Sequence, residues 1–228
     1  MNKSWLTIIF VGIATPALTQ NTHFLPQQGP SDASINIAVS NHDEHDGNMY
    51  FEEADKNERK GELNEAVTLF GKAAFEYNSS KQLDRYGSAL LRLSNVHYLL
   101  EHYTEAEQVV LNVAIKNYSK LGSRKGLVDS YYQLGRIYLA STKYTQSLWF
   151  YTQQGILARQ IGNERAYIES VIGIANVKIR KKDFVLASRD LTRAELLAKA
   201  SNFSQYKAQI KEARAQIPVK KATKKESK

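Results

Sequence analysis

The chain of 228 residues contains no cysteine, only four prolines and no apolar run long enough to cross a bilayer. The absence of cysteine excludes a disulfide scaffold, a thiolate zinc site, a thiol nucleophile and a lipid-modified N-terminal cysteine. None of the prolines lies between Tyr50 and Ile217. Because proline interrupts helices, this long proline-free region suits long uninterrupted helices.

Catalytic signatures are also missing. The sequence has no Gly-rich phosphate loop, no Gly-x-Ser-x-Gly and no His-Glu-x-x-His motif. We interpret His97 as a packed, hydrogen-bonded core histidine that is separated from His102. The ligand-rich stretch 42–46 (His-Asp-Glu-His-Asp) is interpreted as part of an acidic linker rather than a metal site. We therefore expect no enzyme activity, no metal and no cofactor.

What the chain does contain is a repeat. Four columns of residues recur with steps of 40, 41 and 40 positions, and a period in this range is the signature of a stacked repeat array. Because a small residue on one helix lets a bulky residue of its partner approach, each unit is predicted to be a packed pair of helices. The columns are Ala54, Ser94, Gly135 and Ala175; Leu63, Tyr103, Tyr144 and Phe184; Ala66, Ala106, Ser147 and Ala187; and Phe70, Val110, Tyr151 and Leu191.

Apolar residues inside the units follow helical spacing. In the third unit Leu127, Tyr131, Leu134 and Tyr138 recur at steps of three and four, which marks one face of a helix. Glycines at 122 and 162 are predicted to end helices in the left-handed conformation. After the fourth unit, a further amphipathic stripe from Phe203 to Ile217 predicts a capping helix. The predicted fold is an all-α solenoid of four helix-turn-helix repeats plus a C-terminal capping helix, over residues 48–217.

These repeats resemble the tetratricopeptide repeat family. Leu134-Gly135 with Tyr138 and then Tyr144 matches the family's pattern, and segments 63–66 (Leu-Asn-Glu-Ala) and 103–106 (Tyr-Thr-Glu-Ala) match its second helix. The family's unit has about 34 residues, so the chain resembles a longer variant of about forty. The resemblance covers residues 49–202 and implies a right-handed superhelix. Polar Glu53 and Asn57 depart from the pattern in the first unit, as suits a polar end cap.

The resemblance also implies a binding groove. In the family, the first helices of successive units line a concave surface that holds peptides or partner helices. Counting from the small residue of each unit predicts a set of groove-facing residues whose amides and guanidinium groups suit a peptide backbone and a carboxylate. They are Arg92, Asn95 and Tyr98 in the second unit, Asp129, Tyr132, Gln133 and Arg136 in the third, and Glu169, Asn176 and Arg180 in the fourth.

The two ends of the chain carry different signals. Lys3, the apolar run 6–14 and the small residues that follow Pro16 predict a signal peptide at residues 1–19. The run is too short to span a bilayer, which needs roughly 20 residues, although an uncleaved anchor is the alternative. Residues 20–47 are predicted to be a disordered linker and residues 218–228 a basic disordered tail. We therefore expect an exported protein, periplasmic or secreted, with no transmembrane span after signal cleavage.

Charge is distributed unevenly, and it leaves several functions open. The net charge is +8, but residues 48–116 carry −3 and residues 117–216 carry +10. The main hypothesis is an exported interaction scaffold that binds a peptide, a protein segment or another copy of itself. The alternatives are a sensory input module acting through a separate signalling partner, and attachment to an anionic envelope surface through the basic C-terminal half. No nucleic-acid partner is expected.

Overall fold

The computed structural model describes residues 44–218 of the protein. The predicted signal peptide (1–19), the predicted linker up to residue 43 and the predicted tail beyond Pro218 lie outside the described residues. Within residues 44–218 the chain forms helices and turns without any strand. The helices are α1 (Glu44–Lys60), α2 (Leu63–Ser79), α3 (Leu83–Leu99), α4 (Tyr103–Gln108), the π-helical turn η1 (Val109–Ala114), α5 (Ile115–Leu121), α6 (Arg124–Ala140), α7 (Tyr144–Gln160), α8 (Glu164–Arg180), α9 (Phe184–Ala200) and α10 (Tyr206–Ala215).

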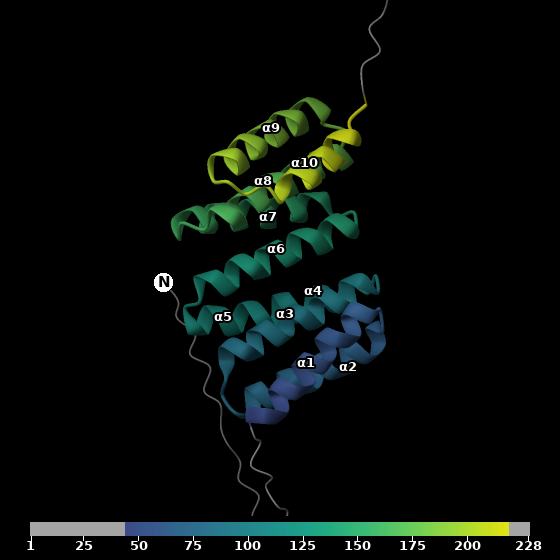
Figure 1. Ribbon diagram of the computed structural model, residues 1–228, viewed down its shortest axis with the longest axis vertical. Coiled ribbons are helices and arrows are strands. Elements are labelled where there is room, and N and C mark those ends of the chain that lie inside the picture. Colours follow the sequence, from purple (N-terminus) through teal and green to yellow (C-terminus); the bar gives the residue numbers. More distant parts are fainter. Residues whose placement is uncertain (1–43, 219–228) are drawn as a thin grey trace, which may run out of the picture. The chain divides into compact units, whose positions relative to one another are not determined.

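The helices form four consecutive pairs and a single last helix. Since α4, η1 and α5 follow one another without a break, they make one continuous second helix for the second pair. Each helix packs against the next one in the chain, and the first helices also touch along the array, α3 with α6 and α6 with α8 (Figure 1). The predicted all-α solenoid of four helix pairs is confirmed.

The irregular step of 41 residues has a structural origin. Phe70 and Val110 are equivalent and lie 40 positions apart, whereas the next equivalent pair, Tyr77 and Tyr118, lies 41 apart. The extra residue therefore enters between Val110 and Tyr118, where the structure has the π-helical turn. A π-helical turn contains one more residue than an α-helical turn, so it absorbs the insertion while Ala114 and Tyr118 remain buried.

The turns between helices share one backbone feature. Each contains a residue with positive φ, which reverses the chain after a helix ends. The predictions for Gly122 and Gly162 are confirmed, with φ of 66° and 69°. The full set of positive-φ turn residues is Gly61, Lys81, Glu101, Gly122, Thr142, Gly162, Lys182 and Asn202.

The predicted small columns lie where helices meet. Ala54, Ser94 and Ala175 are fully buried, and Gly135 is buried with them. A Cβ at position 135 would lie 2.7 Å from Cδ1 of Tyr151, so only glycine permits this approach. Two serines in the small columns also bridge the helices of their pairs: Ser94 Oγ donates to the carbonyl of Ala106 (2.9 Å) and Ser147 Oγ to that of Gly135 (2.7 Å).

The first helix starts four residues before residue 48, the predicted start of the repeat domain. Helix α1 begins at Glu44, inside the segment predicted to be a linker. Tertiary contacts account for this: Gly47 is buried against the ring of Tyr77, whose hydroxyl donates to Oδ1 of Asn48 (2.9 Å). The polar residues of α1 behave differently from one another, since Glu53 is exposed while Asn57 is buried.

The last helix covers the far end of the array, as predicted. Helix α10 packs mainly on α9 and also touches α8, and it buries Tyr206, Ile210 and Ala213. These residues join one apolar cluster with Leu191 and neighbouring residues of α8 and α9. No helix among residues 44–218 combines the length and the apolar character that crossing a membrane requires.

Candidate functional site

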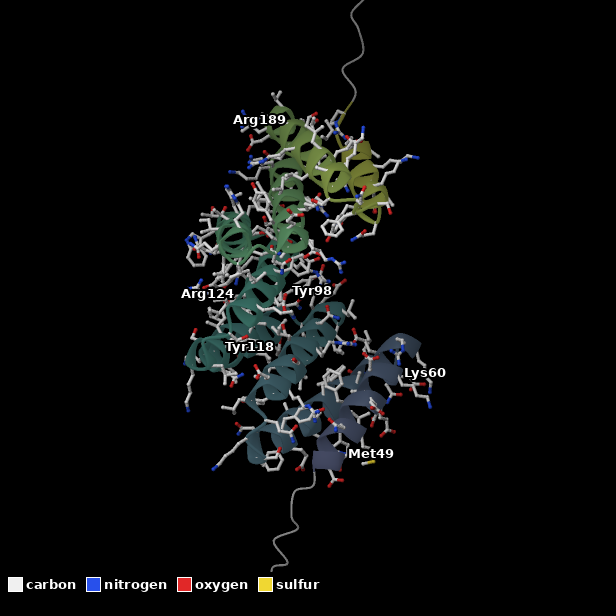
Figure 2. The ribbon with its side chains drawn as sticks, turned by 60° about the vertical axis from the view of Figure 1, so that its left-hand side comes forward. Met49, Lys60, Tyr98, Tyr118, Arg124 and Arg189 are labelled. Atoms are coloured by element: carbon white, nitrogen blue, oxygen red, sulfur yellow. The ribbon has the colours of Figure 1, made fainter. Side chains whose placement is uncertain are left out.

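The first helices of the second, third and fourth pairs line a cavity of about 290 Å³, which we call the groove pocket. Helices α3, α6, α8 and α10 contribute to it, together with α7 and the turn before it. Of the predicted groove residues, Tyr98, Tyr132, Arg136, Glu169, Asn176 and Arg180 line this pocket. The sequence therefore identified residues that the fold brings together from three helices, and Tyr98 lies near the middle of the array (Figure 2).

Arg136 is the central cation of the groove pocket. Its Nη1 donates to Oδ1 of Asn95 (2.9 Å) and to Oε1 of Gln133 (3.0 Å). Its guanidinium carbon lies 4.3 Å from the ring centroid of Tyr98 and 5.7 Å from that of Tyr132. All these partners are neutral, and Arg136 forms no ion pair with a carboxylate in the described part of the chain. Arg136 is thus held in place with its charge not neutralised.

Arg92, by contrast, is neutralised by carboxylates of α1. It forms ion pairs with Asp55 and with Glu58, whose Oε2 lies 2.5 Å from its Nη2. Asn95 completes the network, since its Nδ2 donates to Oε1 of Glu58 (2.7 Å). Arg92 and Asn95 do not line the pocket. Arg92 instead ties α3 to α1, whereas Asn95 accepts the hydrogen bond from Arg136 on α6 and so helps to position that arginine.

Two further predicted residues lie outside the pocket. Asp129 is paired with Lys125 one turn earlier on α6, with Oδ2 and Nζ 3.2 Å apart. Gln133 is only 5% exposed, and its Oε1 accepts the hydrogen bond from Arg136. Gln133 therefore orients Arg136 from a buried position and is not available to a ligand.

The acidic group of the pocket is Glu169. Burial raises the pKa of its carboxyl group, the hydrogen bond from Tyr206 opposes this rise, and the nearby charge of Asp129 adds to it. The Tyr206 hydroxyl donates to Oε1 of Glu169 at 2.7 Å. Burial also raises the pKa of Tyr132 and of Tyr151, so both phenols are neutral at physiological pH. The pocket thus combines neutral aromatic groups with two arginines and one carboxylate.

Several pocket residues were missed at the level of sequence. Tyr151 was assigned to packing alone, but it also lines the pocket, between Gly135 and Gly173. Gly173 could have been noticed in the sequence. A glycine inside a helix costs about 1 kcal/mol relative to alanine, so its presence indicates a close contact with another part of the chain. Gln209 had no such signal, since its contribution depends on where α10 docks.

The prediction for His97 is wrong. Its Nδ1 is buried but has no hydrogen-bond partner among the described residues, and burial lowers the pKa of its imidazole. The turn after α3 also brings His102 close, with ring centroids 6.1 Å apart, although the two residues were expected to be separated. No group of three or more potential metal-ligating side chains occurs in residues 44–218.

No protein-family model matches the chain, and no curated protein is found to be similar to it. We therefore infer the function from the geometry of the array and its cavities.

Proposed function

We propose that the array is a protein-interaction scaffold and that its groove pocket binds an acidic segment of a partner protein. The observation that carries this proposal is the state of Arg136. Its guanidinium is oriented by Asn95 and Gln133 and stacked on Tyr98, and none of these partners neutralises its charge. An arginine can bind a carboxylate with two charge-assisted hydrogen bonds. Because the Arg136 side chain is already oriented, it loses little conformational entropy when the carboxylate binds.

The surrounding residues suit a peptide rather than an isolated ion. Asn176 offers one donor and one acceptor to a peptide backbone, and Arg180 adds a second positive charge at the pocket. The tyrosines provide flat apolar surface together with polar hydroxyl groups. The resemblance to tetratricopeptide repeats supports the same function, because members of that family bind peptides with the first helices of their units.

Arg136→Gln tests this proposal. Peptides selected from a phage-displayed random library on the immobilised chain should be enriched in aspartate and glutamate. Fluorescence anisotropy with one such labelled peptide should show at least about tenfold weaker binding to Arg136→Gln, because a hydrogen bond to a charged group contributes about 1.5–3 kcal/mol.

Arg124→Gln is the matched control, since Arg124 is an exposed arginine on the same helix outside the pocket (Figure 2). It should bind the peptide like the wild type and keep the wild-type unfolding midpoint, and both variants should keep the wild-type helical circular dichroism spectrum. Wild-type affinity in Arg136→Gln, or an equal loss of affinity in both variants, would contradict peptide binding in the groove pocket.

We also propose that the scaffold acts outside the cytoplasm, on the strength of the signal-peptide pattern in residues 1–19. Mass spectrometry of the protein purified from its native cells should find an N-terminus between about Ala17 and Asn21. An intact Met1 would contradict cleavage and favour the anchored alternative.

A further inference from the structure

A second cavity, of about 430 Å³, lies where α7 ends, α8 begins and α9 ends. We call it the α7–α9 crevice. It shares no lining residue with the groove pocket. Its lining includes the polar and aromatic residues Arg159, Tyr167 and Arg193 and the apolar residues Ile168 and Leu197.

Two arginines from different helices converge on one aromatic ring in this crevice. The guanidinium carbon of Arg159 lies 5.5 Å from the ring centroid of Tyr167, and that of Arg193 lies 5.6 Å from it. Arg193 also donates a hydrogen bond to the Tyr167 hydroxyl. Cation–π contacts of this kind favour the positions of both guanidinium groups, even though their like charges repel each other.

Neither arginine has an acidic partner. Among the described residues, no carboxylate forms an ion pair with Arg159 or Arg193, and Glu164 lines the same crevice without pairing with either. Two guanidinium groups provide several N–H donors in planar forks, and this arrangement matches the oxygens of a phosphate group. The start of α8 faces the same cavity through Asn163 and Glu164, and a helix N-terminus adds partial positive charge.

The positive charge continues along this edge of the array. Leu197 and Ser201 line the α7–α9 crevice, whereas the adjacent Ala198 and Lys199 line a cavity of about 630 Å³ between α9 and α10. Lys199 and Lys207 of that cavity are the repeat equivalents of Arg159 and Tyr167, 40 positions later in each case. Neighbouring cations raise the local positive potential and so favour an anionic ligand in both cavities.

We propose that the α7–α9 crevice is a binding site for phosphate groups. Arg159 and Arg193 bind the phosphate oxygens, and the Tyr167 ring holds both guanidinium groups at the same cavity. The site is independent of the groove pocket and of the partner that binds there. A soluble phosphorylated ligand and a phospholipid headgroup share this chemistry, so the experiment separates the two sources.

Isothermal titration calorimetry of the full chain with inorganic pyrophosphate tests the site. We expect saturable binding that weakens at least about tenfold in Arg159→Gln and in Arg193→Gln, because each loses charge-assisted hydrogen bonds. Arg189→Gln is the control, since Arg189 is an exposed arginine on α9 outside both cavities (Figure 2). All three residues are exposed, and circular dichroism and the unfolding midpoint should be unchanged in every variant.

Sedimentation with phosphatidylcholine vesicles, with and without phosphatidylglycerol, forms the second arm. Binding to pyrophosphate that requires both arginines identifies a soluble phosphate ligand. Binding only to the phosphatidylglycerol vesicles, with the same requirement, identifies a lipid headgroup. The proposal is overturned if neither probe binds saturably, or if Arg189→Gln weakens binding as much as the two crevice variants, because that result would indicate diffuse attraction to a basic surface.

Discussion

The substitution Gly135→Ala tests how tightly the array is packed at its centre. A Cβ at this position of α6 would lie 2.7 Å from Cδ1 and from Cε1 of Tyr151, which is closer than side-chain atoms approach. Tyr151 has little room to move, because it is only 3% exposed and its ring is in equally close contact with Gly173 on α8. The added methyl group must therefore displace a ring that two helices hold.

Two opposing effects set the magnitude. Forcing a methyl group into a well-packed contact costs about 1–3 kcal/mol. Replacing a glycine inside a helix with alanine stabilises the helix by about 1 kcal/mol, so the expected net loss is about 0–2 kcal/mol. Gly71→Ala separates the two effects, since Gly71 lies inside α2 and a Cβ there would meet no neighbouring atom within 4 Å. Gly71→Ala should stabilise the protein by about 0.5–1 kcal/mol, because it has the helical gain without the clash.

Urea unfolding followed by far-ultraviolet circular dichroism measures both variants against the wild type. The difference between them should be about 1–3 kcal/mol, which is the steric contribution alone. Gly135→Ala should cost less in a Tyr151→Leu background, since the fourth unit naturally pairs Ala175 with Leu191 at the equivalent positions. If Gly135→Ala raised the unfolding midpoint as much as Gly71→Ala, the close contact with Tyr151 would be refuted.

Two further predictions concern the π-helical turn and the buried carboxyl group. Deleting Asn112 from η1 should keep the unfolding midpoint close to that of the wild type, whereas deleting Gln153 from α7 should lower it strongly. The first deletion removes the extra residue, while the second rotates the rest of a regular helix by about 100°; equal damage from both would contradict this explanation. Because burial raises the pKa of Glu169, the folded state binds more protons than the unfolded state just above the ordinary glutamate pKa, and stability falls as pH rises through that window. The glutamine of Glu169→Gln can still accept the hydrogen bond from Tyr206. In unfolding measurements this variant should be more stable than the wild type at neutral pH and lose the advantage at acidic pH. A stability difference that does not change with pH would contradict the raised pKa of Glu169.

The repeat register was readable in the sequence because helix pairing is a nearly local property. Each pair buries its own small and bulky residues, so Ala54, Ser94 and their equivalents recur at the spacing of the units. Even the extra residue between Val110 and Tyr118 was visible as a change of step from 40 to 41. That a π-helical turn absorbs it, with both Ala114 and Tyr118 buried, is visible only in the tertiary structure.

Which partners each polar side chain contacts, and whether its charge is neutralised, was decided by the tertiary structure alone. Arg92 and Arg136 are the same residue type in neighbouring units, two and one positions from their small residues, and the sequence predicted the same role for both. Arg92 is neutralised by Asp55 and Glu58 of α1, while Arg136 meets only amides and aromatic rings. Likewise, Arg159 and Arg193 are far apart in the chain and share one ring because α7, α8 and α9 meet there. Contacts between helices of different pairs depend on how the units stack, and periodicity along one chain carries no record of which charges then face each other.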